Sequence, residues 1–122
     1  MPTRCRCNRL FVFVAALIVI MGCNEIDRQT ARDMAAEEVC AEAERCDNLG
    51  DDGLHPTHAD CIVEERLRFD DAWPENECGG GSIDIDAFDR CIDRALEVAC
   101  HDRPLDWMVA TEVCASRNVC SN

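Results

Sequence analysis

The chain has 122 residues, and its 25 acidic residues against 12 basic ones give a formal net charge of −13 at pH 7. This charge argues against nucleic acid and anionic lipid surfaces as electrostatic partners, because both are bound through basic surface. Every basic residue is an arginine and tyrosine is absent, so two side chains that enzymes often use for catalysis are missing.

The first 23 residues have the organisation of a secretory signal peptide. Three arginines and no acidic residue precede a short apolar run that begins at Leu10. The run has about 12 residues, whereas a membrane-spanning helix needs roughly 20. It ends in Ile20-Met21-Gly22-Cys23, which resembles the bacterial lipobox, the motif whose cysteine is lipidated and becomes the mature N-terminus.

We therefore expect residues 1–22 to be removed and Cys23 to carry a diacylglyceryl thioether and an N-acyl chain. Several acyl chains on one residue hold a protein on a membrane stably, which a single chain does only marginally. The expected location is the cell membrane or the outer membrane, facing the periplasm or the cell exterior. An uncleaved anchor helix and secretion with cleavage elsewhere are the two alternatives. The remaining chain has nine arginines and 25 acidic residues, a net charge of −16.

Eight cysteines follow Cys23, and an even number in a small exported domain indicates a framework of four disulfides. They are Cys40, Cys46, Cys61, Cys78, Cys91, Cys100, Cys114 and Cys120. A domain of about 90 residues with few aromatic side chains buries a modest core, and each disulfide adds roughly 2–4 kcal/mol. Metal binding by thiolates is the alternative, which export disfavours because exported cysteines oxidise. The spacing leaves the pairing open, and Cys46 with Cys61 is our prediction for one local bridge.

Hydrophobic periodicity predicts four short helices after a polar tether at residues 23–30. The first helix spans Ala31 to about Cys46, with Thr30 as its N-cap. The second spans His58 to Asp71, after a capping box that begins at Thr57.

The third predicted helix, from about Asp84 to Ala99, has the clearest apolar stripe in the chain. Pro104 fits the first position of a fourth helix, because proline is favoured there.

The second helix separates its residues into a buried and a solvated face. Ile62, Phe69 and Trp73 fall near one face and are expected in the core. Glu64 and Glu65 belong to the charged residues that we expect to face water.

Two histidines, His55 and His58, are the candidate metal ligands of the chain. They lie three residues apart with Asp60 and Cys61 nearby, and such side chains bind zinc or copper. A loop histidine followed by a histidine at a helix start, with Cys61 oxidised, is the alternative that we favour, because zinc motifs normally contain a second pair of ligands.

Catalytic motifs are missing from the sequence. Ser82 follows three glycines but is not part of a Gly-x-Ser-x-Gly elbow. The Cys-x-x-Cys motif of thioredoxin-like redox enzymes and the phosphate-binding glycine loop followed by lysine are absent as well. We therefore expect no enzyme and no cofactor.

The cysteine segments give the chain a family resemblance. Ala36 to Cys46, Cys61 to Pro74, Cys78 to Cys91, and Cys114 to Cys120 resemble the small cysteine-rich lipoproteins of myxobacterial type. Members of this uncharacterised family are labelled as natural-product biosynthesis lipoproteins, and no active residues are assigned in it. The resemblance covers nearly all of the chain after Cys23 and implies a link to natural-product biosynthesis or export.

The sequence thus predicts an all-α domain at residues 31–122, a small disulfide-stapled bundle of about four short helices. We expect a non-enzymatic binding or accessory module at the cell envelope. Its lipid anchors it in the membrane, and its partner is an envelope protein or a small molecule. The alternative is an envelope metal-binding lipoprotein that uses His55, His58 and carboxylates.

Overall fold

The structure is a computed structural model, which describes residues 24–78, 80–100 and 112–121. The predicted signal peptide at residues 1–22 and the predicted lipidation site, Cys23, lie outside the described residues. Most of the predicted fourth helix, from Pro104 onward, lies outside them too.

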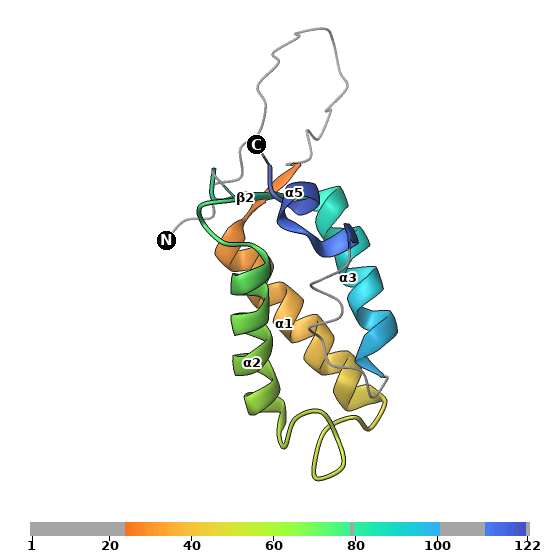
Figure 1. The fold of residues 1–122 in the computed structure, drawn as a ribbon. Helices are drawn as coiled ribbons and strands as arrows, with labels where there is room; N and C mark the ends of the chain where they lie inside the picture. The colour runs from red at the N-terminus through yellow and green to blue at the C-terminus, as the bar shows by residue number, and fades with distance from the viewer. Residues whose placement is uncertain (1–23, 79, 101–111, 122) are drawn as a thin grey trace, which may run out of the picture.

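The helices form a bundle in which the first one is central. α1 (Arg28–Arg45) lies between α2 (His58–Ala72) and α3 (Ile85–Ala99) and packs against both of them (Figure 1). The short helices η1 (Glu112–Cys114) and α5 (Ser116–Val119) pack against α3. The prediction of a small disulfide-rich helical bundle is therefore confirmed. Within the described ranges, no helix has the length and apolar character that crossing a bilayer requires.

The segment predicted as a polar tether belongs to the fold, so that prediction is wrong for its described part. β1 (Glu25–Asp27) pairs antiparallel with β2 (Ser82–Asp84), which places Ile26 opposite Ile83. Strands of three residues are too short to show alternation in a sequence. The pairing brings the start of the described chain next to the start of α3 (Figure 1).

α1 begins three residues earlier than predicted, because Asp27 and not Thr30 is its N-cap. A side-chain oxygen of Asp27 accepts a hydrogen bond from the backbone N–H of Thr30 at 3.1 Å. Both residue types are favoured at N-caps, and the two positions are one helical turn apart. The sequence alone could not choose between Asp27 and Thr30 as the N-cap, because nothing in it shows that a strand ends and the helix begins at Asp27.

The predicted starts of α2 and α3 agree with the structure. The Thr57 hydroxyl accepts a hydrogen bond from the backbone N–H of Asp60 at 3.1 Å, which caps α2. A carboxylate oxygen of Asp84 accepts one from the backbone N–H of Ala87 at 2.8 Å, which caps α3. Pro74 follows the C-cap of α2, Trp73, as expected from the bias against helix before proline.

The main core lies between the helices near the sheet. The Trp73 ring packs against Phe69 with 4.9 Å between ring centroids and against Phe88 with 6.0 Å. The Trp73 indole N–H donates to the carbonyl oxygen of Cys114 at 3.1 Å, so the buried ring has its polar atom satisfied. Ile62, Phe69 and Trp73 are buried, as predicted from the stripe of α2.

Four disulfides join all eight cysteines that the sequence assigned to the framework. The pairs are Cys40–Cys61, Cys46–Cys100, Cys78–Cys120 and Cys91–Cys114. The prediction of a Cys46–Cys61 bridge is wrong.

That error has a geometric cause. Cys46 is the C-cap of α1, and residues 47–57 extend beyond the helix before α2 returns antiparallel (Figure 1). Cys61, in the first turn of α2, therefore lies opposite Cys40, which is well inside α1.

The Asp84 cap provides a local test of the fold. Replacing Asp84 with Ala should lower the free energy of unfolding by about 1 kcal/mol, because the N–H of Ala87 loses its acceptor. Asp89→Ala is the matched control on the exposed side of the same helix and should change it by less than about 0.5 kcal/mol. Urea unfolding followed by circular dichroism measures both, and equal losses would contradict the capping role.

Candidate functional site

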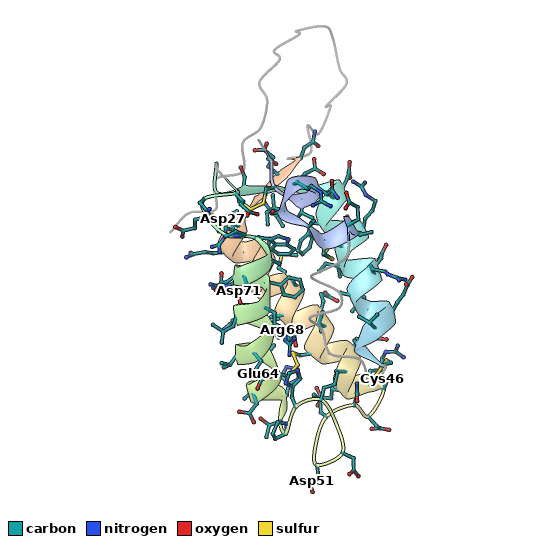
Figure 2. The ribbon with its side chains drawn as sticks, in the orientation of Figure 1. Asp27, Cys46, Asp51, Glu64, Arg68 and Asp71 are labelled. Atoms are coloured by element: carbon teal, nitrogen blue, oxygen red, sulfur yellow. A yellow bond between two sulfur atoms is a disulfide. The ribbon has the colours of Figure 1, made fainter. Side chains whose placement is uncertain are left out.

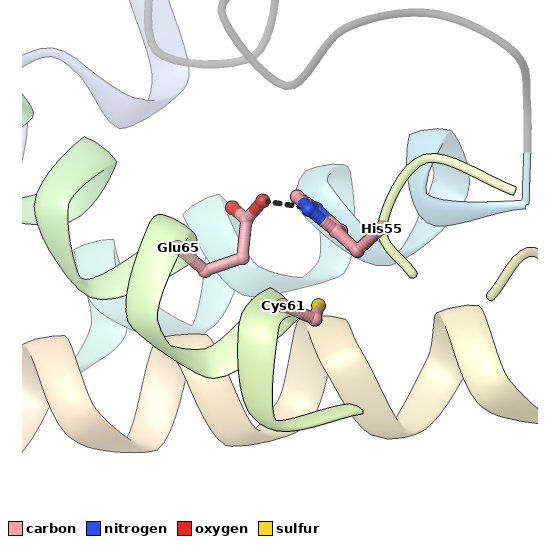
Figure 3. A group of neighbouring side chains, drawn as sticks. All are labelled: His55, Cys61 and Glu65. Atoms are coloured by element: carbon pink, nitrogen blue, oxygen red, sulfur yellow. Dashed lines mark hydrogen bonds and ion pairs between the residues drawn. The ribbon is translucent and has the colours of Figure 1, made fainter. Parts of the chain in front are cut away.

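A buried contact between a histidine and a carboxylate joins the loop after α1 to the middle of α2. The His55 Nε2 and Glu65 Oε1 atoms are 3.1 Å apart, and the residues are 3% and 0% exposed (Figure 3). The prediction that Glu65 faces water is therefore wrong. The helical register of Glu65 does indicate burial, because Glu65 lies one turn from Cys61 and one turn from Phe69 on the buried stripe.

The loop at residues 47–57 is shaped to deliver His55 to this position. Leu49 and His55 form an isolated parallel bridge, in which the Gly50 N–H donates to the His55 carbonyl oxygen at 2.9 Å. A Cβ atom at Gly53 would lie 2.3 Å from the Asn48 carbonyl oxygen, so only glycine fits there. The tight course of the loop thus turns the imidazole inward.

Further charges surround the pair. His55 Nδ1 is 3.0 Å from Glu64 Oε2, and Arg68 Nε is 3.6 Å from Glu65 Oε1. A buried carboxylate is tolerated only when cations or donors compensate the loss of water. His55 and Arg68 provide that compensation for Glu65, so the cluster can hold the loop against α2.

Three donor atoms of this cluster lie close enough together to be considered as a metal site. Ligand atoms of His55, Cys61 and Glu65 lie within 4.8 Å of one another and are buried. The Cys61 sulfur is bonded to Cys40, so it offers no thiolate to a metal ion. A structural zinc site usually needs four protein ligands, and with Cys61 oxidised this cluster offers at most two, His55 and Glu65. The residues present therefore do not fit a structural zinc ion.

The two histidines predicted as joint ligands contact different carboxylates. His58 Nδ1 is 3.0 Å from Glu44 Oε2 and His58 Nε2 is 4.0 Å from Glu37 Oε2, both on α1. Within the described ranges, the carboxylates that His55 contacts, Glu64 and Glu65, belong to α2. The structure therefore gives His55 and His58 separate partners rather than one shared site.

A second charge network lies between α1 and α2, closer to the sheet. Asp70 accepts from Arg28 Nη2 at 3.1 Å and from Arg32 Nη1 at 3.1 Å, and Arg66 Nε is 3.2 Å from Asp33 Oδ1. Partial burial lowers the pKa of the Arg32 guanidinium, but hydrogen bonds and charges from Asp33 and Asp70 outweigh it and the pKa is raised. These arginines are already paired with acids, so the network serves the packing of the two helices.

An open pocket of about 300 Å³ lies beside this network, at the N-terminal end of α1. Its lining includes Asp27, Arg28, Glu75 and Gly81. The Arg28 side chain is committed to Asp70 and to the Trp73 carbonyl oxygen, so the cation of the pocket is not available to a ligand. The pocket is polar and small for a ligand site, and its lining residues do not indicate which class of ligand would bind.

The surface of α2 opposite the core carries apolar and acidic side chains in adjacent rows, and we call it the α2 outer face. Its exposed residues are Ala59, Val63 and Leu67 in one row and Asp60, Glu64 and Asp71 in the other. Val63 and Leu67 are 59% and 60% exposed, although both are large and apolar. Figure 2 shows Glu64 and Asp71 along this helix.

Residues 40–122 match the model of DUF6184, which is described as a family of unknown function. No curated protein and no solved structure matches the chain.

The buried pair can be tested with a double-mutant cycle. Glu65→Leu alone should lower the free energy of unfolding by about 3–5 kcal/mol, because it leaves His55 buried without that carboxylate. Adding His55→Leu should recover part of the loss, since both polar groups are then gone. Thermal or urea unfolding of the two single variants and the double variant gives the coupling energy.

His58→Leu is the matched control for this cycle. His58 is partly exposed and pairs with exposed carboxylates, so its replacement should cost less than about 1 kcal/mol. Additive losses at His55 and Glu65 would show that the contact does not stabilise the loop.

Proposed function

The chain belongs to DUF6184, a family of unknown function, and we propose that it is a lipid-anchored, non-enzymatic binding or accessory module of the bacterial cell envelope. The observation that carries the proposal is the pairing of all eight cysteines from Cys40 to Cys120 in four disulfides. Such a framework is typical of exported proteins, because disulfides persist in oxidising compartments. It supports the interpretation of residues 1–22 as an export signal.

The proposed anchor is Cys23, and its place in the chain decides how the domain is presented. β1 begins at Glu25, so a single residue separates the cysteine from the first strand. The folded domain would therefore rest directly on its lipid. This arrangement suits a module that meets partners at the membrane surface.

The proposed binding surface is the α2 outer face. Its apolar row of Ala59, Val63 and Leu67 would contact the apolar side of a partner helix, and its row of carboxylates would contact basic side chains. Amphipathic helices bind other proteins through residues repeated at this spacing. Because the chain without residues 1–22 has a net charge of −16, the fitting partner is a basic amphipathic segment of another envelope protein.

The resemblance to lipoproteins labelled for natural-product biosynthesis adds a context to this proposal. We place the module among the accessory proteins of natural-product biosynthesis or export. This part of the proposal rests on the resemblance alone.

The anchor is tested by the intact mass of the protein extracted from its own membranes. We expect a chain that starts at Cys23, carries acyl chains and lacks about eight hydrogens because of four disulfides. Cys23→Ser should release the protein from the membrane fraction. A chain that begins at another residue, or that stays membrane-bound as Cys23→Ser, would overturn the anchor.

The binding surface is tested by titrating a synthetic amphipathic helix of leucine and lysine into the oxidised protein. Replacing Val63 and Leu67 with Ser should raise the Kd by roughly tenfold or more, because the apolar row is lost and the charges remain. Met34→Ser on α1, which removes another exposed apolar residue, is the matched control and should leave the Kd unchanged.

Isothermal titration calorimetry measures these affinities. A peptide in which serine replaces leucine should bind weakly to both proteins. If the Val63/Leu67 variant binds the leucine peptide as tightly as the unmodified chain, the α2 outer face is not the binding surface.

A further inference from the structure

The four disulfides differ in how far solvent reaches them. Three bridges are buried, with six cysteines that are nearly or completely inaccessible: Cys40, Cys61, Cys78, Cys91, Cys114 and Cys120. In the remaining bridge Cys46 is half-buried and Cys100 is exposed. Cys46–Cys100 is therefore the bridge of the four whose residues are most open to solvent.

The exposed bridge connects two helix ends that other contacts also hold together. Cys46 is the C-cap of α1 and Cys100 is the C-cap of α3, at the end of the bundle remote from the sheet (Figure 2). The Asn48 side-chain amide donates to the Ala99 carbonyl oxygen at 2.8 Å, directly beside the bridge. Because this hydrogen bond and the packing of α1 on α3 do not involve the sulfur atoms, they remain when the S–S bond opens.

Charged side chains flank the Cys100 sulfur atom. Glu42 Oε1 is 3.7 Å from Cys100 Sγ, and Arg45 Nε donates to Glu42 Oε2 at 2.9 Å. The hydrogen bond from Arg45, opposed by some desolvation, lowers the pKa of Glu42. The carboxylate repels an incoming thiolate, while the exposed guanidinium of Arg45 attracts it. The rate of attack therefore depends on these two side chains.

We propose that Cys46–Cys100 is a thiol–disulfide exchange site, at which an envelope dithiol reductant opens and closes one bridge of the folded domain. The thiolate of the reductant attacks Cys100 Sγ and forms a mixed disulfide, and Cys46 leaves as a thiolate that takes up a proton. The second thiol of the reductant then attacks the mixed disulfide. Cys100 is released as a thiol, and the reductant departs with its own disulfide. Two electrons pass from the reductant to the bridge.

The reduced form would differ from the oxidised form at one end of the molecule only. Opening the bridge removes the covalent link between α1 and α3 and leaves the three buried disulfides in place. The loop at residues 47–57, which Asn48 attaches to α3, would then depend on its hydrogen bonds. The proposal does not depend on the lipid anchor or on the α2 outer face.

Limited reduction of the oxidised full-length protein tests the proposal. The protein is exposed to dithiothreitol for increasing times, quenched with N-ethylmaleimide, and mapped by peptide mass spectrometry. We expect label on Cys46 and Cys100 at a rate at least about tenfold above that of any other cysteine, because the other bridges react only after local unfolding. Earlier labelling of another pair, or simultaneous labelling of all eight cysteines, would overturn the proposal.

Two variants distinguish exchange from a purely structural role. The Cys46→Ser/Cys100→Ser variant should keep the far-ultraviolet circular dichroism of the unmodified chain and its three other bridges. Loss of the helical signal would overturn the proposal. Glu42→Gln should accelerate the reaction with anionic glutathione several-fold and the reaction with cationic cysteamine less, because a repelling carboxylate is removed. If Glu42→Gln accelerated the reactions with both thiols by the same factor, attack at Cys100 would be contradicted.

Discussion

Trp73 joins parts of the chain that are far apart in the sequence, and the packing near the sheet depends on where it lies. Its indole N–H donates to Cys114, its carbonyl oxygen accepts from the Arg28 guanidinium, and its ring packs between Phe69 and Phe88. α1, α2, α3 and η1 thus meet at one residue, through its ring and its backbone carbonyl oxygen. In a chain with few aromatic residues, this contact and the disulfides share the stabilisation that a larger core would provide.

Much of the helical fold could be predicted, because apolar residues recur along the chain at the spacing of a helix. The stripe that includes Phe88 and Ile92 predicts α3, and the caps at Thr57 and Asp84 mark where α2 and α3 begin. The sheet could not be predicted, because strands of three residues have no measurable alternation and Ile26 pairs with a residue far along the chain. A polar composition was therefore interpreted as a tether.

The candidate site was only partly predictable, for a different reason. The sequence marks His55 as a candidate ligand, but the charge of Glu65 predicts that it faces water, although its helical register matches the buried residues. Register was the better guide here, since a carboxylate can be buried when His55 and Arg68 compensate it. The disulfide of Cys46 was missed because proximity in sequence favoured Cys61, whereas the helix ends of α1 and α3 meet only in three dimensions.

The pairing of β1 with β2 has a mechanical consequence for an anchor at Cys23. A long flexible tether would let the domain reorient freely above the bilayer. A strand paired into the fold would instead keep the domain close to its lipid and restrict that motion. α1 has 18 residues and is about 27 Å long at 1.5 Å per residue, so it would separate the loop at residues 47–57 from an anchored end by about that length. The loop at residues 47–57, with Asp51 at its tip in Figure 2, would be carried at a constant height above the lipid. A partner would then have to bind the protein at that distance from the lipid, because the short link to Cys23 would not let the domain move further away.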